Sequence, residues 1–419
     1  MKPITGGIDF GTSNSTVGIV ENGQPSLVPL EGEHPTIPTA VFFNFETNRT
    51  EFGRHAIANY TDNVEGRLLR ALKSVLGTSL IGEKTRVKAQ SIAFTDIIGA
   101  FLQHLKSALD EKRGGDVEHV VLGRPVHFVD DDPAADAKAQ GELEQAARKR
   151  GFKHIAFQFE PIAAALDYER TVTREELALI VDIGGGTSDF SIVRVSPDRA
   201  KQADRRGDIL ANTGVHVGGT DLDRLISVAH VMPELGYNTL TKDGRRNLPV
   251  GTYFDLATWQ RINLLYTAKA MNTLRQIRYE AAEPHKVERL IDVVENRQGH
   301  ALAAKVETAK IELTDAEQTE LDMRLMAEVL RVTVTRPGLE KAITPPVGRI
   351  TDTITRTLAD AGLTPDRIDT LFLTGGSTAV PLLRESVLRL FPNARAVQGD
   401  RFGSVGLGLA LDAERKFAA

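Results

Sequence analysis

Residues 181–189 read Val-Asp-Ile-Gly-Gly-Gly-Thr-Ser-Asp, and residues 8–16 read Ile-Asp-Phe-Gly-Thr-Ser-Asn-Ser-Thr. Each stretch is the end of an apolar strand that carries an aspartate, followed by a tight turn of Gly, Thr and Ser and the start of a second strand. Self-similarity within one chain is typical of a duplicated architecture. We therefore predict two phosphate-binding hairpins that face each other across a cleft and grip one nucleotide from both sides.

The residue types in these turns suit a phosphate group. Glycines lack a Cβ and adopt positive φ, so their backbone N–H groups can approach phosphate oxygens closely, and the neighbouring Thr and Ser hydroxyls add donors. The aspartates repel phosphate unless a cation lies between them, and Mg²⁺ with a mostly aqueous shell is the usual cation. Asp9, Asp182 and Asp189 are therefore the candidate metal residues. The alternative is two ordinary hairpin turns capped by Asp.

The composition limits the classes of protein to which this chain can belong. A chain of 419 residues is long enough for two or more lobes, and 41% hydrophobic with 26% charged residues is ordinary for a globular protein. The net charge of −5 predicts neither nucleic acid nor an anionic membrane as a partner. The absence of cysteine excludes disulfides and thiolate metal sites. With no signal-peptide pattern and no apolar run near the ~20 residues of a membrane span, we expect a cytoplasmic protein.

Periodicity predicts mixed α/β structure in two halves. Apolar residues between 94 and 109 repeat at helical spacing, and a Gly-Gly pair at 114–115 ends that helix. The region 221–348 has long helical stretches and few strand signals. The strands predicted at 7–10, 15–20, 25–30 and 39–45 form a meander. Further strands are predicted at 119–123, 155–157, 177–183, 189–195, 209–213 and 370–373, and further helices at 134–150, 161–169 and 403–417.

These motifs resemble the actin-like ATPase superfamily, and more closely the ATPase domain of the 70-kDa heat-shock chaperones of the DnaK type. Residues 7–15 resemble the first phosphate motif of the family and 182–189 the second. Further stretches follow in the family's order along nearly the whole chain. They are 71–77 with the catalytic lysine, 160–166 with the first connecting helix, 218–223, the adenosine helix 307–314, the adenosine turn 375–378 and the second connecting helix 405–410.

The resemblance implies an α/β fold of the actin-like ATPase type, a duplicated ribonuclease H-like architecture with two lobes around a nucleotide cleft. It implies an ATPase that uses ATP or ADP with Mg²⁺, K⁺ as an additional ion, and a protein client or co-chaperone as partner. The implied catalytic residues are Lys73, Glu160, Asp182 and Thr187. The implied nucleotide-binding residues are Gly11, Thr12, Ser13, Asn14, Gly184, Gly185, Gly186, Thr187, Gly218, Gly219, Glu307, Lys310, Thr314, Gly375, Gly376 and Ser377.

The resemblance also predicts the domain organisation. The first lobe is expected at 1–172, with its core at 1–45 and 116–172 and a subdomain at 46–115. The second lobe is expected at 173–419, with its core at 173–226 and 349–419 and a subdomain at 227–348. The sequence ends directly after the last helix of the family's ATPase domain, so we expect no C-terminal peptide-binding domain. This departure, with Ala379 where the family has an arginine that packs on adenine, indicates a short, YegD-like branch.

Individual residues have plainer interpretations. Lys73 could belong to a solvated basic face of a helix, in a row with Arg67 and Arg70. Glu307 and Lys310 could form an i, i+3 ion pair on a helix surface.

Glu160, next to Pro161, could merely stabilise a helix N-terminus, and the single tryptophan, Trp259, is expected in the core.

The function also has alternatives. A small-molecule kinase on the same fold, an actin-like filament subunit and a nucleotide sensor with little turnover remain open, because a fold alone does not decide function.

Overall fold

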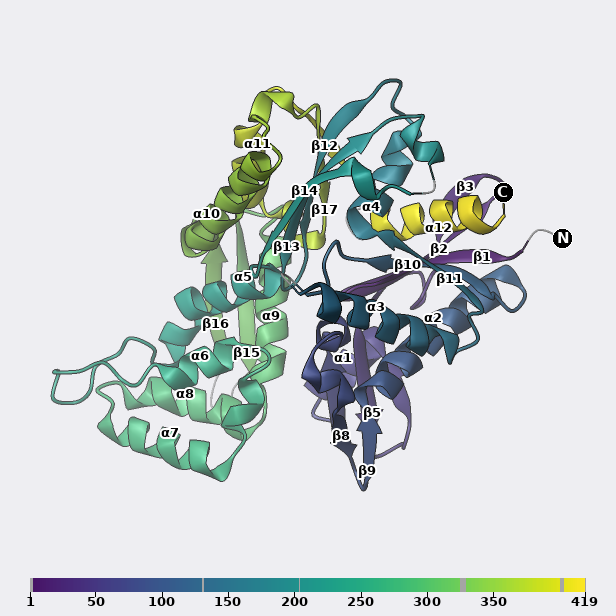
Figure 1. Ribbon diagram of the computed structural model, residues 1–419. Coiled ribbons are helices and arrows are strands. Elements are labelled where there is room, and N and C mark those ends of the chain that lie inside the picture. The colour runs from purple at the N-terminus through teal and green to yellow at the C-terminus, as the bar shows by residue number, and fades with distance from the viewer. Residues whose placement is uncertain (1–2, 130–131, 203, 325–328, 400–402, 419) are drawn as a thin grey trace.

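Two five-strand sheet paths with the same connectivity organise the chain (Figure 1). The computed structural model describes residues 3–129, 132–202, 204–324, 329–399 and 403–418. The first sheet has the order β11-β10-β1-β2-β3, with β4 paired to β2 as a sixth strand. Its strands are β1 (Thr5–Phe10), β2 (Asn14–Glu21), β3 (Gln24–Leu27), β4 (Thr36–Pro38), β10 (His119–Arg124) and β11 (His154–Phe159).

The second sheet repeats this order as β18-β17-β12-β13-β14. In both sheets the central strand pairs antiparallel with the strand that follows it and parallel with a strand much later in the chain. The duplicated, two-lobed α/β fold is therefore confirmed. The strands of the second sheet are β12 (Glu176–Ile183), β13 (Ser188–Val195), β14 (Ile209–Val215), β17 (Thr370–Thr374) and β18 (Arg395–Gln398).

Two helices lie between the sheets and join the halves. They are α4 (Glu160–Glu169) and α12 (Ser404–Phe417), which pack against each other and share one apolar core with both sheets. A Cβ on Gly408 would lie 1.8 Å from the backbone oxygen of Ala163. Only glycine lets the two helices approach this closely, so a single residue sets how the halves meet.

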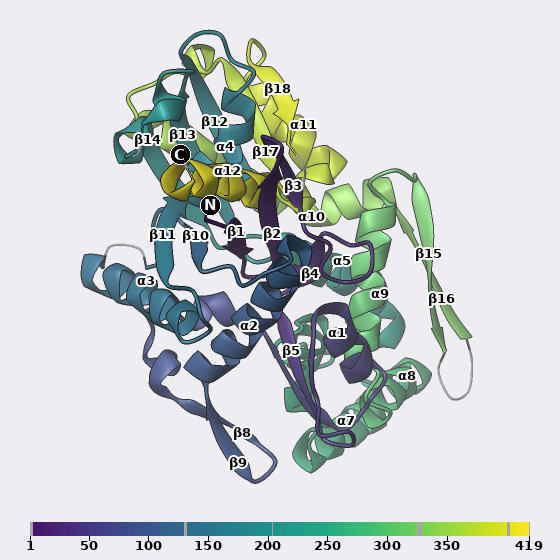
Figure 2. The same cartoon turned by 90° about the vertical axis from the view of Figure 1, so that its right-hand side faces the viewer.

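The outer faces of the sheets are covered by further helices (Figure 2). An apolar core joins the first sheet to α2 (Phe94–Arg113) and α3 (Pro133–Arg148), and another joins the second sheet to α10 (Arg336–Asp360) and α11 (Pro381–Leu390). The helix α2 ends at Gly114 with φ of 68°, the left-handed conformation that glycine favours and that the Gly-Gly pair predicted. No helix in these described ranges is long and apolar enough to cross a membrane.

Each half carries an outer part. The first holds a three-stranded sheet, a two-stranded hairpin and one helix: β5 (Ala40–Asn44), β6 (Thr50–Phe52), β7 (Gly66–Arg70), β8 (Lys84–Val87), β9 (Gln90–Ala93) and α1 (Gly53–Thr61). The second holds α5 (Gly219–Ile226), α6 (Gly251–Ala257), α7 (Ala268–Glu280), α8 (Pro284–Glu295), α9 (Gly299–Glu312), β15 (Gln318–Arg324) and β16 (Val329–Thr335). The residue boundaries of the two lobes and their subdomains stay predictions.

One expectation about these outer parts is wrong. The strand at 39–45 does not continue the first meander, because β5 pairs with β6 and β7 in a sheet of its own. The region 221–348 has the long helical stretches that were expected, and its two strands, β15 and β16, form an antiparallel hairpin. Buried and exposed residues alternate along both strands, and this period of two was the signal for them.

Lys73 does not lie on a helix with Arg67 and Arg70. Both arginines belong to the strand β7, and the chain then turns at Ala71, whose φ is 55°. A 3₁₀ turn over Leu72–Val75 follows and buries Lys73. The interpretation of Lys73 as part of a solvated helix face is therefore wrong.

Candidate functional site

The two glycine-rich turns lie against one another. A Cβ on Gly185 would come within 2.2 Å of the Oγ of Ser13, so the turn after β12 touches the turn after β1. Residues 172 positions apart are thus brought together where the two central strands end. In open α/β sheets this edge, beyond the carboxyl ends of the strands, is where ligands bind.

The first turn is held by a buried threonine. The Thr39 hydroxyl donates to the Gly11 carbonyl at 2.8 Å and lies 2.9 Å from the Ser15 hydroxyl, while the Thr39 N–H donates to the Ser13 carbonyl at 2.8 Å. Asn14 begins β2 and pairs there with Pro38. Sequence reasoning missed Thr39, because a threonine 28 residues from its partner carries no local signal.

The second turn is a scaffold for two distant segments. The Gly219 N–H donates to the Gly184 carbonyl at 2.9 Å, and the Ser377 hydroxyl donates to the same carbonyl at 3.2 Å. A Cβ on Gly218 would lie 2.5 Å from the backbone of Gly185, and a Cβ on Gly375, whose φ is 81°, would lie 2.4 Å from the backbone oxygen of Ile183. These glycines are required because backbones touch here. The structure therefore gathers three predicted stretches, 184–187, 218–219 and 375–377, at one place.

A cluster of carboxyl groups lies below the turns. Asp182 pairs opposite Asp189 across β12 and β13, and Thr187 donates its hydroxyl to Asp189 at 3.1 Å. Burial, together with the charges of Asp189, Glu160 and Asp9, raises the pKa of Asp182 to about 8. Burial and the charge of Glu160 raise the pKa of Asp9 to about 7, against the opposing effect of Lys73. Burial is thus the main cause of both shifts, and the neighbouring carboxyl groups add to it.

Lys73 is the cation of this cluster. Its Nζ lies 2.5 Å from the Oε1 of Glu160 at the start of α4, and only 9% of its side chain is exposed. Burial lowers the pKa of Lys73, but the carboxylates of Glu160, Asp9 and Asp189 outweigh burial and raise it, so the ammonium stays charged. The plain interpretation of Glu160 as a helix-terminus charge does not account for this buried ion pair.

The cluster suits a hydrated divalent cation. Four carboxyl groups, of Asp9, Glu160, Asp182 and Asp189, face one ammonium, and this imbalance would be relieved by a bound dication. Among the residues that the structure describes, no three His, Asp or Glu side chains come close enough to chelate an ion directly. Carboxylate oxygens are the ligands that Mg²⁺ prefers, directly or through its water shell, so the donor set of this cluster fits that ion.

The helix α9 contributes Lys310 to the site, and the alternative of a surface ion pair between Lys310 and Glu307 is wrong. Lys310 lies 2.8 Å from Asp223 and donates to the Gly219 carbonyl at 3.3 Å, so its partner is on α5 and not at Glu307. Burial raises the pKa of Asp223 to about 6, although Lys310 opposes the shift. Asp223 was missed as a site residue, although it ends the quoted stretch 218–223.

Other predicted residues are less engaged. The Thr314 hydroxyl donates to the Ile311 carbonyl at 2.7 Å, just after the end of α9. A Cβ on Gly186 would meet nothing within 4 Å, so this part of the turn is open. Gly376 begins a 3₁₀ turn over Gly376–Ala379. Thr12 is half-buried at the first turn.

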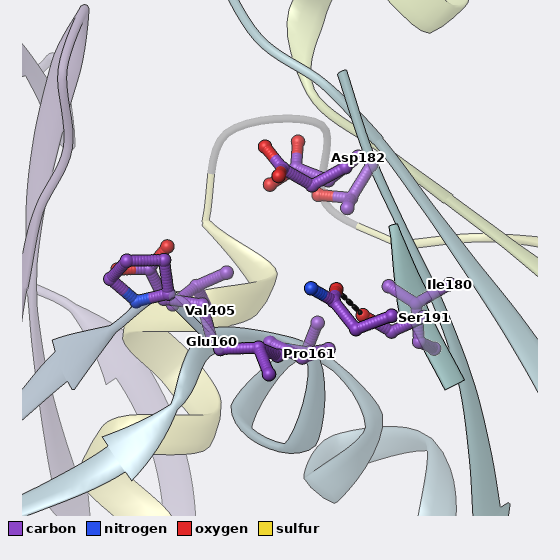
Figure 3. A pocket seen from close by; sticks show the side chains of 12 residues that line it. Glu160, Pro161, Ile180, Asp182, Ser191 and Val405 are labelled. Carbon is purple, nitrogen blue, oxygen red and sulfur yellow. Dashed lines mark hydrogen bonds between the residues drawn. The ribbon is translucent and has the colours of Figure 1, made fainter. Parts of the chain in front are cut away.

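A pocket adjoins the carboxyl cluster (Figure 3). Glu160 and Pro161 of α4 lie on one side, and Ser191 and Asp182 of the second sheet on the other. The Ser191 hydroxyl donates to the Asn212 side chain at 2.8 Å, a bond drawn as a dashed line in the figure. Glu160, Asp182 and Asp189 line this pocket, so it borders three of the four carboxyl groups of the cluster.

This duplicated sheet, with two touching glycine turns above a carboxyl cluster, defines the actin-like ATPase fold. The family model described as Hsp70 protein matches residues 5–247 and 275–414, and the chain belongs to this family. Residues 248–274 lie between the matched segments.

Relatives support the assignment. The chain is 27% identical over 430 residues to "Chaperone protein DnaK" of Thermus thermophilus, across 97% of this chain and 60% of that protein. It is 26% identical over 431 residues to "Chaperone protein HscA homolog" of Shewanella putrefaciens, across 97% of this chain and 58% of that protein. The chain therefore spans about 60% of the length of these relatives. Its place on a short branch of the family stays a prediction.

Proposed function

We propose that this protein binds Mg·ATP between the two glycine turns and hydrolyses it, and that the nucleotide state sets how the lobes close. The observation that carries the proposal is the approach of Ser13 to Gly185 directly above the carboxyl cluster with its buried Lys73–Glu160 pair. Such turns bind phosphate oxygens through backbone N–H groups. Residues of both lobes would then bind one triphosphate group, and this group would bridge the lobes.

The metal would be held by Asp9, Asp182 and Asp189 through its water shell. Bound Mg²⁺ supplies positive charge that neutralises phosphate oxygens. The carboxyls must be ionised for this role, and the raised pKa values of Asp9 and Asp182 mean that metal binding releases protons near neutral pH.

Hydrolysis would depend on positioning and charge. Glu160 would orient the attacking water through its carboxylate, and Lys73 would stabilise charge that develops as the γ-phosphoryl group leaves. Thr12 and Thr187 would donate hydroxyl hydrogen bonds to the γ-phosphate. A buried lysine and glutamate at 2.5 Å favour turnover over a sensor that only binds, because a charged pair is costly to bury without a role.

The adenosine would lie on the α9 side of the cleft. Lys310 donates to the Gly219 carbonyl there and Ser377 to the Gly184 carbonyl. Glu307, Gly375 and Gly376 belong to the same segments as these two residues. Ala379 offers no planar cation to stack on the base, so we infer weaker adenine binding than an arginine would give.

The chaperone-like output is part of the proposal. The relatives are named chaperones, and they are longer than this chain, so a protein client or co-chaperone is proposed from their names alone. Closure of two lobes around a ligand is a common way for nucleotides to change a partner surface.

Calorimetry tests the proposal. Titration of the chain with ATP should show binding that requires Mg²⁺ and is weakened in both Asp9→Ala and Asp182→Ala. The exposed carboxyl of Asp352 on α10 offers a control, Asp352→Ala, which should bind like the wild type. Unchanged Mg·ATP affinity in both site variants would contradict the proposed metal residues, and no binding by the wild type would contradict the function.

A further inference from the structure

A second cavity lies within the first lobe, where its outer part meets its core. The cavity measures about 460 Å³, and its walls come from the connection between β3 and β4, from β6 and from the helices α1 and α2. Cavities that bind small molecules measure roughly 300–1,000 Å³ and are usually preformed. We call this space, lined by Glu31, Glu51, Phe52, Asn59 and His104 among others, the β6–α1 cavity. Its lining includes none of the predicted nucleotide or metal residues, so it is separate from the site between the lobes.

Two flat rings stack on each other in the wall of the β6–α1 cavity. The rings of Phe52 and His104 are 14° from parallel, with 4.5 Å between their centroids. Phe52 also packs edge-on against the buried Phe101, with 6.1 Å between centroids, which ties the stack to the core. Burial lowers the pKa of His104, although the charge of Glu31 opposes the shift, so the ring is neutral at pH 7. The wall therefore contains uncharged aromatic surface, which suits an aromatic ligand.

Glu31 is the first of two carboxylates in this wall. Its side chain is 10% exposed, and its two oxygens accept from the Arg54 backbone N–H and from the Arg54 guanidinium, both at 2.7 Å. The same guanidinium donates to the Thr36 carbonyl in β4 at 2.6 Å. Glu31 thus already has a cationic partner, and these bonds fix its position. Because an ionised carboxylate has about four lone-pair sites, it can still accept from a ligand.

Glu51 is the second carboxylate, and it lacks a cationic partner. Its two oxygens accept from the side-chain amides of Asn44, at 3.2 Å, and of Asn59. Within the described ranges, no lysine, arginine or histidine forms an ion pair with Glu51. The cavity opens to solvent, because Arg49 and His55 line it and are exposed. A carboxylate that neutral donors hold in an open cavity is a ready partner for a cationic ligand.

We propose that the β6–α1 cavity binds a small organic cation with a flat aromatic body, an aromatic amine or amidine. The positive group would pair with the Glu51 carboxylate, and the aromatic body would pack on the wall that Phe52 and His104 form. A neutral aromatic compound would leave Glu51 unpaired, and an anion would be repelled by both carboxylates. A metal ion does not fit, because no three His, Asp or Glu side chains in the described part of the chain come close enough to hold one.

Benzamidine, a flat aromatic cation, tests the cavity when the full chain is titrated without nucleotide. The wild type should bind it with a dissociation constant of about 1 mM or lower. Benzamide has nearly the same shape without the charge, and it should bind roughly tenfold more weakly, because a charge-assisted hydrogen bond is lost. In NMR spectra of labelled histidine rings, the His104 signals should shift on binding. Those of His285, exposed on α8, should not.

Variants of the wall locate the binding site. Glu51→Gln keeps the size of the side chain and removes its charge, so benzamidine should bind roughly tenfold more weakly. Phe52→Leu should weaken binding a few-fold through loss of the aromatic contact. Glu46→Gln is the matched control, because it makes the same charge change at an exposed residue outside the cavity. Asp182→Ala should also bind benzamidine like the wild type, because the carboxyl cluster between the lobes is a different site.

Three results would overturn the proposed site: no benzamidine binding by the wild type, equal affinity for benzamidine and benzamide, or wild-type affinity in Glu51→Gln. Loss of binding in Asp182→Ala, with binding retained in Glu51→Gln, would place benzamidine in the nucleotide cleft instead. The comparison of the two compounds uses the wild type, so it decides the matter if a variant does not fold. The site is independent of the proposed function, because a chain that binds benzamidine but no Mg·ATP would contradict that function alone.

Discussion

At the scale of the residue, burial and neighbouring charges together set the pKa values of the site. Burial first, and then the charges of neighbouring carboxyl groups, raise the pKa of Asp9 to about 7 and the pKa of Asp182 to about 8. Such a cluster destabilises the fold when no cation is bound and suits a protein that binds one. Perturbed pKa values of this kind are typical of functional sites.

Lys73 should serve chemistry more than binding. An ammonium that acts mainly on charge developing in the transition state changes turnover and leaves ground-state affinity nearly intact. Lys73→Ala should still bind Mg·ATP but hydrolyse it roughly 10²-fold more slowly in single-turnover measurements. Lys341→Ala, on the exposed face of α10, is the control. Wild-type single-turnover rates in Lys73→Ala would leave this lysine a structural role only.

Asp182 should make the metal-free protein less stable as the pH rises. Its folded-state pKa of about 8 lies above the ordinary 3.8, so the folded chain keeps a proton that the unfolded chain releases. Stability from this group is present at pH 4 and is lost as the pH approaches 8, by up to about 1.4 kcal/mol per pH unit. Urea unfolding with a chelator should show that Asp182→Asn weakens this loss between pH 5 and 8. Parallel pH profiles for variant and wild type would contradict the assigned cause.

Ala379 should limit the affinity for adenine nucleotides. Ala379→Arg would add a planar cation beside the proposed base site, and such stacking is worth about 0.5–2 kcal/mol. Calorimetry should therefore show ATP binding that is tighter by a few-fold up to about thirtyfold. If Ala379→Arg tightens the binding of inorganic triphosphate by the same factor, the arginine contacts phosphate and not the base.

At the scale of the element, the close crossing of α4 and α12 connects the two sheets. Gly408 leaves no room for a Cβ against Ala163. The packing of α4 against α12 and the contact between the two lobes therefore depend on the same residue. Gly408→Ala should destabilise the fold by about 1–3 kcal/mol through overpacking. Gly141→Ala in α3 is the matched control, because its Cβ would meet nothing within 4 Å and helix propensity favours alanine. Denaturant unfolding that ranks the two variants equally would contradict this argument.

At the scale of the whole molecule, a nucleotide would connect lobes that also meet at α4 and α12, at the two glycine turns, and where Tyr60 packs against His300. A ligand that binds only the folded state stabilises it by about 2.7 kcal/mol at a hundred times its dissociation constant. Because both lobes would contact the phosphates, calorimetric unfolding with saturating Mg·ADP should show a single transition for the whole chain, at a higher temperature than without nucleotide. Two transitions, of which only one shifts, would place the nucleotide on a single lobe.

The sequence by itself determined the duplicated motif and its chemistry. The two glycine turns, their aspartates and the ordered stretches around Lys73, Glu160 and Lys310 are local patterns, and local patterns specify turns, strand ends and residue types. From them the α/β class and the facing hairpins could be predicted, and the structure agrees on both.

Only the tertiary structure decided which side chains become partners. Lys73 pairs with Glu160, 87 residues away, and Lys310 pairs with Asp223 instead of the nearby Glu307. Two further contacts depend on how the sheets and outer parts pack together. Thr39 holds the first turn, and Trp259, which the sequence suggested for the core, is half-buried between Arg70 and His300. Such pairings depend on distances between elements, which a linear pattern does not contain, because packing and charge act through space and not along the chain.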